Sequence, residues 1–127
     1  MPDTPQNQFS IDVNVTYIDE QSAPEEHRYV FAYTIHIENQ GDTAARLIGR
    51  HWIITNADGK TQEVIGEGVV GQQPFLRPGE NFSYTSSAAI ETPVGSMHGS
   101  YQMRTENGEH FDAPIPAFSL AKPNTLH

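Results

Sequence analysis

The sequence predicts a single all-β domain built as an antiparallel β-sandwich. Apolar side chains alternate with polar ones in several segments, which is the period of a β-strand with one buried face. Turn-forming residues separate these segments, and no stretch of ten residues has helical periodicity. The chain has 127 residues, enough for one domain with its own hydrophobic core. We expect that domain to cover residues 3–127, with mobile ends at 1–7 and 122–127.

The alternation is clearest in the first two predicted strands, which are rich in β-branched and aromatic residues. Apolar residues occupy every second position in residues 9–17 and again in residues 29–37. The segment between them, residues 19–27, is polar and contains a proline, so we predict a surface connection there.

A third strand is predicted at residues 45–55, and we place Ile48, Trp52 and Ile54 on its buried face. Trp52 is interpreted as the large central side chain that fills the space between two sheets. The alternative is an exposed aromatic anchor for a partner.

Strand register predicts two tight turns. If Trp52 and Val64 share the buried face, the loop between their strands has an odd length, because a one-residue slip reverses every side chain. A three-residue loop ending at Gly59 meets this condition, with the glycine in the left-handed conformation. The same argument pairs Met103 with Phe111 across a loop that ends at Gly108. We therefore predict positive φ at both glycines.

Four further strands are predicted, a short one at about residues 61–65 and longer ones at 82–90, 97–104 and 110–120. In the last one the apolar phase changes between Ile115 and Phe118, which predicts a β-bulge. Pro114 and Pro116 place this strand at the edge of a sheet. Between Val64 and Glu80 we expect irregular, non-helical chain that joins the two sheets, with a type II turn at residues 78–79.

Residues 66–71, GEGVVG, match the pattern GxGxxG. In a dinucleotide-binding fold these glycines let the backbone approach a pyrophosphate at a helix N-terminus. The prolines at positions 74 and 78 leave no room for that helix, so we do not predict that fold. Two interpretations remain. The N–H groups of Gly66, Gly68 and Gly71 hold phosphate loosely, or these glycines serve only a tight connection between strands.

The sequence contains no recognisable catalytic or metal-binding motif. Cysteine is absent, no serine lies in a GxSxG turn, and the histidines form no HxH or HxxxH pair. The alternative to a specific metal site is weak, unspecific binding of divalent ions by the acidic residues of segment 19–26. We therefore predict no enzyme activity, no catalytic residues and no cofactor. The histidines considered as metal ligands are His36, His51, His98, His110 and His127, and the serines predicted to face solvent are Ser83, Ser86, Ser87 and Ser100.

The formal net charge of the chain is −9. Such a surface repels polyanions at long range, which argues against nucleic acid and anionic membranes as partners. The first residues include neither a basic segment nor an apolar run, so no secretory signal is predicted. With the lack of cysteine, this favours a cytoplasmic location.

Several longer runs together resemble a known family. They are RHWII at residues 50–54, GEGVVGQQPFLRPGE at 66–80, ETPVGSMHGSYQM at 91–103 and IPAF at 115–118. Their combination resembles the ApaG (CorD) family of small bacterial proteins, over nearly the whole chain. One departure is the sequence AAI at 88–90, where the family pattern is expected to have a cysteine and a proline.

The resemblance to ApaG implies an immunoglobulin-like or fibronectin type III-like antiparallel β-sandwich. It also implies a gene neighbourhood with a diadenosine tetraphosphate hydrolase and a link to cobalt tolerance and magnesium efflux. Similar domains occur in an F-box protein and in a DNA polymerase delta-interacting protein, where they resemble interaction modules. No catalytic residues come with the family.

Our main hypothesis is therefore a non-enzymatic binding module that contacts another protein through its loops or an exposed edge. The alternative is a small-molecule sensor for a nucleoside polyphosphate or a divalent metal. We expect a monomer or a weak homodimer, because the two prolines of the last strand block one sheet edge.

Overall fold

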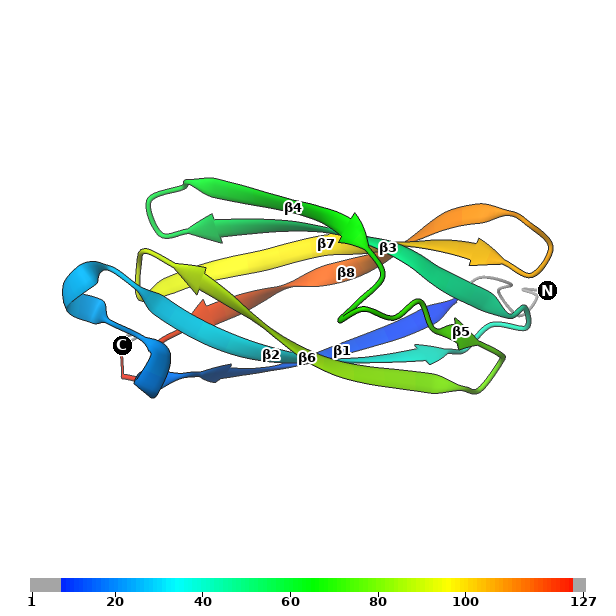
Figure 1. The fold of residues 1–127 in the computed structure, drawn as a ribbon, viewed down its shortest axis with the longest axis horizontal. Helices are drawn as coiled ribbons and strands as arrows, with labels where there is room; N and C mark the ends of the chain where they lie inside the picture. The colour runs from blue at the N-terminus through cyan, green and yellow to red at the C-terminus, as the bar shows by residue number, and fades with distance from the viewer. Residues whose placement is uncertain (1–7, 125–127) are drawn as a thin grey trace, which may run out of the picture.

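The computed structural model describes residues 8–124, and these form two packed antiparallel sheets (Figure 1). The all-β sandwich predicted from the alternation is confirmed, including the immunoglobulin-like or fibronectin type III-like class. The connection between the first two strands contains two short 3₁₀ helices, η1 (Asp19–Gln21) and η2 (Pro24–Glu26). The strands are β1 (Phe9–Tyr17), β2 (Tyr29–Asn39), β3 (Ala45–Asn56), β4 (Thr61–Glu67), β5 (Phe75–Leu76), β6 (Asn81–Ile90), β7 (Val94–Thr105) and β8 (His110–Ala121).

The two sheets differ in width. One has three strands in the order β1-β2-β6, and the other has the order β4-β3-β7-β8 with the short β5 also paired to β3. The chain crosses between the sheets several times, and the segment from β4 to β6 crosses through the glycine-rich loop and β5 (Figure 1). Within residues 8–124 no helix is long and apolar enough to cross a membrane.

The core lies between the sheets and is centred on Trp52, which is 2% exposed. Its indole ring makes edge-on contacts with Tyr33 and Tyr101, with ring centroids 5.5 and 6.4 Å apart, and with Phe118 at 5.9 Å. Full burial of an apolar side chain contributes about 1.5–3 kcal/mol, so these strands are held mainly by their inward faces. Trp52 is thus the central filler that was predicted, and the alternative of an exposed anchor is wrong.

Both predicted hairpin turns are confirmed. Trp52 pairs with Val64 and Met103 pairs with Phe111. The glycines that end the two loops have positive φ, 81° at Gly59 and 88° at Gly108. The predicted turn at residues 78–79 also forms, with φ of 86° at Gly79.

β8 contains the predicted bulge, because Met97 pairs with Phe118 whereas Gly99 pairs with Ile115, leaving one extra residue on β8. The strand also lies at the edge of its sheet, as its prolines predicted.

A second bulge makes one prediction wrong. The register of β3 against β7 shifts between Leu47 and Gly49, so the buried residue before the bulge is Leu47 (0% exposed) instead of Ile48. After the bulge, Trp52 and Ile54 face the core as predicted. Alternation alone did not show the bulge because Leu47 and Ile48 are both apolar.

The expectation of mobile ends falls partly outside the described residues, which exclude 1–7 and 125–127. At the described C-terminal end, the Lys122 N–H donates a hydrogen bond to the Pro93 carbonyl at 2.8 Å.

Candidate functional site

The sandwich is closed along one long side and open along the other. On the closed side, edge strands β1 and β8 meet through Phe9 and Phe111, whose ring centroids are 6.0 Å apart. On the open side, the edge strands are β4 and β6. The sheet that ends in β6 is the narrower one, so part of the inner face of β3 and β4 has no strand opposite it.

A groove runs along this open side, and we call it the β4–β6 groove. It consists of a hollow of about 300 Å³ and a neighbouring hollow of about 360 Å³, which share Ile54, Gln62 and Ala89 in their walls. β6 contributes only small side chains to the first hollow, at residues 86–89. The remaining wall residues of this hollow are Tyr33 from β2, Arg50, Trp52 and Ile54 from β3, and Gln62 and Val64 from β4.

The wall of the groove carries polar groups among apolar ones. The Nε1–H of Trp52 is buried and has no hydrogen-bond partner among the described residues. A buried donor without a partner costs about 1–3 kcal/mol, so such a group is unusual in a native structure. Ser86, which the sequence placed toward solvent, is half-buried and lines the same hollow.

Three tyrosines near the groove, one of them the wall residue Tyr33, have a pKa that burial raises. The pKa of Tyr84 is raised to about 12, mainly by burial, although its hydrogen bond with Tyr101 opposes the shift. Burial raises the pKa of Tyr101 still further, and the neighbouring Tyr84 adds to this. For Tyr33 burial raises the pKa, while the Ser86 hydroxyl and the Arg50 charge oppose it. The hydroxyls of Tyr84 and Tyr101 are 2.5 Å apart.

Arg50 is the charged residue of the first hollow. Its Nη1 donates hydrogen bonds to the carbonyl oxygens of Glu67 and Gly68, at 3.1 and 2.9 Å. Among the described residues, no carboxylate forms an ion pair with Arg50. The N–H groups of Arg50 other than those on Nη1 donate no hydrogen bond to any described residue. A guanidinium has five N–H donors, so Arg50 retains donors for a further acceptor in the groove.

The glycine-rich segment 66–71 adjoins the groove at Arg50. The guanidinium lies over Gly66, where an added Cβ would be 2.7 Å from Nη1. The N–H of Gly68 donates to the Ile48 carbonyl at 2.8 Å. Two carbonyl groups of this segment therefore face a cation. Gly66 lies within β4, paired with Arg50 of β3, and the N–H of Gly68 is already used within the chain.

A tight turn forms the tip of this segment. Val69 and Gln72 exchange two backbone hydrogen bonds of 2.8 and 2.9 Å, and the residues between them both have positive φ, 43° at Val70 and 80° at Gly71. No helix follows, so the dinucleotide fold is absent, as predicted. Phosphate binding at Gly66, Gly68 and Gly71 stays a prediction.

Val70 has an unfavourable conformation for a β-branched residue, since positive φ brings its Cβ against the backbone. It is also 54% exposed, and Ile65 on β4 is 72% exposed. These are the exposed large apolar side chains of the described residues. Backbone strain and apolar exposure thus occur together beside the open side of the sandwich.

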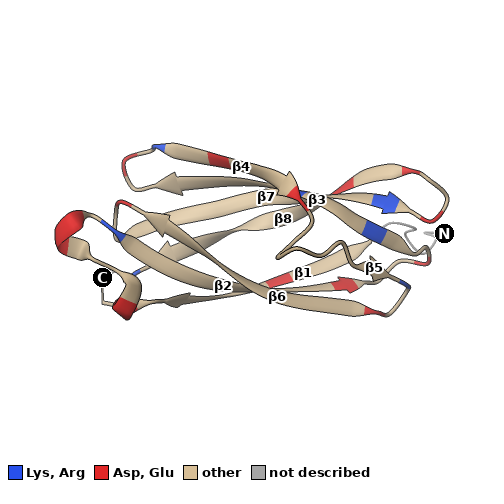
Figure 2. Cartoon of the chain, in the orientation of Figure 1, with Lys and Arg blue, Asp and Glu red and all other residues tan. Residues whose placement is uncertain are grey.

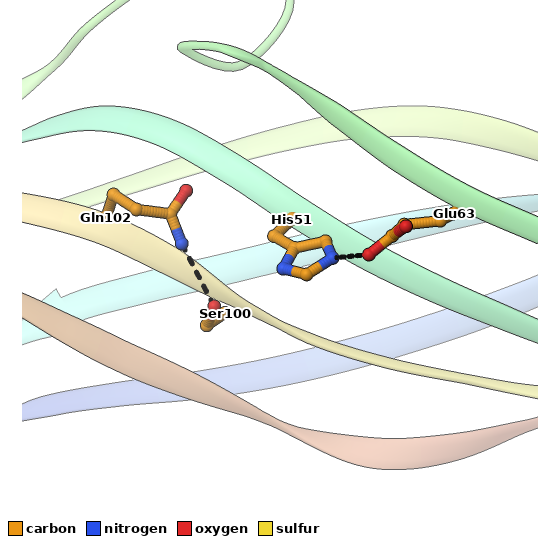
Figure 3. A network of polar contacts seen from close by, with 4 residues as sticks. All are labelled: His51, Glu63, Ser100 and Gln102. Atoms are coloured by element: carbon orange, nitrogen blue, oxygen red, sulfur yellow. Dashed lines mark hydrogen bonds and ion pairs between the residues drawn. The ribbon is translucent and has the colours of Figure 1, made fainter.

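The histidines of the described residues do not gather in one place. His36 Nδ1 and the Ser83 hydroxyl are 2.7 Å apart, and His51 Nε2 lies 2.5 Å from a carboxylate oxygen of Glu63 on the outer face of the wider sheet (Figure 3). His110 lies opposite Arg104, as the register predicted. Residues 8–124 contain no group of three or more His, Cys, Asp or Glu that could hold a metal ion. His127 lies outside the described residues.

This architecture defines an antiparallel β-sandwich domain with one open side. Comparison with known proteins gives the particular family. The family model described as the ApaG domain matches residues 19–105, and the chain belongs to this family.

Full-length relatives agree with this assignment. Protein ApaG of Thiobacillus denitrificans is 62% identical over 94% of this chain and 94% of its own length. Protein ApaG of Methylococcus capsulatus is 58% identical, covering 94% and 95%. A solved structure described as the ApaA protein of Bordetella pertussis is 48% identical and superimposes with a TM-score of 0.92, over 97% of this chain and 100% of that one.

The sequence did not reveal the groove residues. Arg50 and Gln62 are ordinary strand residues in the sequence, and the serines of β6 have the pattern of a solvated face. The small residues at 86–89 were the one available signal, because a run of Ser and Ala on an apolar strand leaves space opposite it.

Proposed function

We propose that this protein is a non-enzymatic binding module that holds an extended segment of a partner protein in the β4–β6 groove. The observation that carries the proposal is the open side of the sandwich, where two unpaired edge strands flank a hollow lined by both apolar and polar residues. An unpaired edge offers a row of backbone N–H and C=O groups that an added strand can use, and pockets for alternate side chains supply specificity.

The charge of the first hollow favours one kind of occupant, while the second hollow is lined by one basic and one acidic residue, Lys60 and Glu91. Arg50 is the charged residue that lines the first hollow, and the half-buried Val64 provides apolar surface beside it, backed by the buried Trp52 and Ile54. We therefore propose a segment with alternating apolar side chains and one carboxylate that faces Arg50, because an arginine pairs bidentately with a carboxylate.

The chemistry of the site supports binding over catalysis. In the described residues the displaced pKa values belong to Tyr33, Tyr84 and Tyr101, and all are raised away from neutral pH by burial. A general acid or base is most effective with a pKa near the working pH. We attribute the link to cobalt and magnesium homeostasis, which the family resemblance implies, to the partner and not to a metal held by this chain.

Selection of displayed peptides from a random library, with the wild-type protein as bait, tests the proposal. We expect selected peptides to share alternating apolar residues and an acidic one. Gln62→Trp fills the groove from an exposed position on β4, and should weaken binding at least about tenfold, as loss of a central contact does. Ser119→Trp is the matched control, since Ser119 is an exposed polar residue of edge strand β8, and it should leave affinity unchanged.

Peptides that bind both tryptophan variants equally would place the binding surface elsewhere and overturn the proposal. Arg50→Lys should reduce the preference for the acidic residue while keeping the positive charge. A second copy of this chain is the other possible occupant. It would appear as concentration-dependent dimerisation in sedimentation velocity that Gln62→Trp abolishes, and this result would contradict a partner protein as occupant.

A further inference from the structure

A row of basic side chains crosses three strands of the wider sheet, away from the β4–β6 groove. Arg46 on β3 pairs directly with Arg104 on β7, and Arg104 pairs directly with His110 on β8. We call these three residues the basic row. Figure 2 shows the basic segments of β3 and β7 side by side at the end of the sandwich that carries the β7–β8 turn.

This arrangement is unfavourable for folding alone. Like charges directly opposite one another on adjacent strands destabilise a sheet. A nearby carboxylate would relieve the repulsion, but the ion pairs of residues 8–124 are His51–Glu63 and Arg77–Glu80, so neither arginine of the row has an acidic partner within 4.0 Å. In a chain with seven Lys and Arg residues and a net charge of −9, placing two uncompensated arginines together needs another cause.

The structure also holds one arginine of the row in place. Arg46 Nη1 donates a hydrogen bond to the Gln73 carbonyl at 2.7 Å. Its guanidinium lies 5.3 Å from the centre of the Phe75 ring, and that of Arg77 lies 5.6 Å from the same centre. A third cation is thus close to the row, and Arg46 is oriented before any ligand arrives.

The basic row lines a hollow of about 480 Å³. Phe75, Thr105, Gly108 and the carboxylate-bearing Glu106 also line it. All three side chains of the row are exposed, so a solute reaches them directly.

We propose that the basic row is a binding site for a small phosphate-bearing anion with at least two negative charges. Guanidinium groups bind phosphate oxygens bidentately, and a ligand with several charges removes the repulsion between Arg46 and Arg104 on binding. A nucleic acid fits less well, because the net charge of −9 repels a long polyanion. The site uses side-chain cations, whereas the loop prediction for Gly66, Gly68 and Gly71 relied on backbone N–H groups. It is independent of the proposed groove function.

Titration of ¹⁵N-labelled protein with pyrophosphate, at constant ionic strength, tests the site. Ionic strength is fixed because added salt screens exposed charges. We expect the amide signals of Arg46, Arg104, Gly108 and His110 to shift together. Inorganic phosphate should bind more weakly than pyrophosphate, and sulfate should show whether double charge alone is sufficient.

Variants with matched charge changes identify the residues that bind. Arg46→Gln and Arg104→Gln should each weaken pyrophosphate binding about tenfold, the usual loss for one hydrogen bond to a charged group. Glu106→Gln should strengthen it. Arg28→Gln is the control, because Arg28 lies at the end of β2 away from the basic row. The other end of β2, at Asn39, is the one near the row, since the Asn39 side chain donates a hydrogen bond to the carbonyl of Leu76, the neighbour of Phe75. Arg28→Gln should leave binding unchanged.

A melting temperature measured without ligand gives a second criterion. If the row is retained for binding, Arg104→Gln should melt at a higher temperature than the wild type while binding pyrophosphate less well. Absence of coordinated shifts at about 20 mM pyrophosphate, which is about twentyfold above a millimolar Kd, would overturn the proposal. Equal losses in Arg28→Gln and Arg104→Gln would also overturn it. Binding of an acidic tetrapeptide, acetyl-Glu-Glu-Glu-Glu-amide, to the basic row without binding of pyrophosphate would overturn it as well.

Discussion

The two long sides of the sandwich end their sheets in different ways. On the β1–β8 side, large side chains such as Phe9 and Phe111 meet between the edge strands, and Pro114 and Pro116 remove backbone donors from the edge. On the β4–β6 side, the edge strand β6 presents small residues and the edge strand β4 has no proline. One side therefore completes the core, and the other leaves a groove.

Under the proposed function, one side of the sandwich serves stability and the other serves recognition. Apolar contacts that close the β1–β8 side remove surface from water and stabilise the fold in proportion to that area. The β4–β6 side gives up part of this contribution and keeps unpaired edges. Substitutions on the closed side should thus change stability, whereas those on the open side should change binding.

The largest effect is expected at Trp52, which contacts Phe118 of the closed side and also lines the groove. Trp52→Ala should lower the free energy of unfolding by about 3–5 kcal/mol, because it removes the central side chain and leaves a cavity. Urea denaturation followed by circular dichroism measures the change. A loss below about 1 kcal/mol would mean that the two sides are not joined through this residue.

A smaller effect is expected on the closed side alone. Phe111 is half-buried, so Phe111→Ala should cost about 2 kcal/mol, less than a fully buried phenylalanine. The matched substitution on the open side, Gln62→Ala, should stay within about 0.5 kcal/mol of the wild type, since Gln62 is exposed. Equal costs in urea denaturation would remove the distinction between the two sides.

A gain in stability is expected at the turn beside the open side. Val70→Gly should raise the free energy of unfolding by about 1 kcal/mol, because glycine tolerates a φ of 43° that strains valine. Gly68→Ala is the opposite test, since φ there is 62° and an added Cβ would be 2.3 Å from the Gln72 carbonyl oxygen. The melting temperatures of the two variants should shift in opposite directions. A shift of both in the same direction would contradict backbone strain at Val70.

The smallest effect at ordinary pH comes from the tyrosines behind the groove. Unfolded tyrosines lose their proton near pH 10, whereas Tyr84 keeps its proton up to a pKa of about 12 in the folded protein. Between these values the unfolded state binds fewer protons, so stability is complete below about pH 10 and decreases as the pH rises toward 12. Melting temperatures from pH 8 to 11.5 measure this, and Tyr84→Phe should reduce the slope. A melting temperature independent of pH above 10 would contradict the burial of the Tyr84 hydroxyl.

Much of the fold was predictable because its signals are local. The period of two placed the long strands, and register arithmetic placed Gly59 and Gly108 in the left-handed conformation with φ of 81° and 88°. The bulge in β8 was visible because its two apolar runs are out of phase. The bulge in β3 was missed because Leu47 and Ile48 are both apolar, so either one fits the alternation.

The candidate sites were not predictable in this way. Hairpin register placed His110 opposite Arg104. Nothing in the sequence placed Arg46 beside Arg104, because β3 and β7 are distant in sequence and pair only in the folded sheet. The glycine motif drew attention to residues 66–71, yet the guanidinium over Gly66 belongs to Arg50 of another strand.

By itself the sequence determined the long strands, the residues that turn the chain and the central place of Trp52, since these depend on the φ preferences, side-chain size and polarity of neighbouring residues. It did not give β5 (Phe75–Leu76) or the end of β4 at Glu67, which lie in the segment expected to be irregular. Only the tertiary structure decided which side of the sandwich stays open and which cations become neighbours. Those properties depend on strand order and on the unequal width of the two sheets, which arise from contacts between segments far apart in the chain.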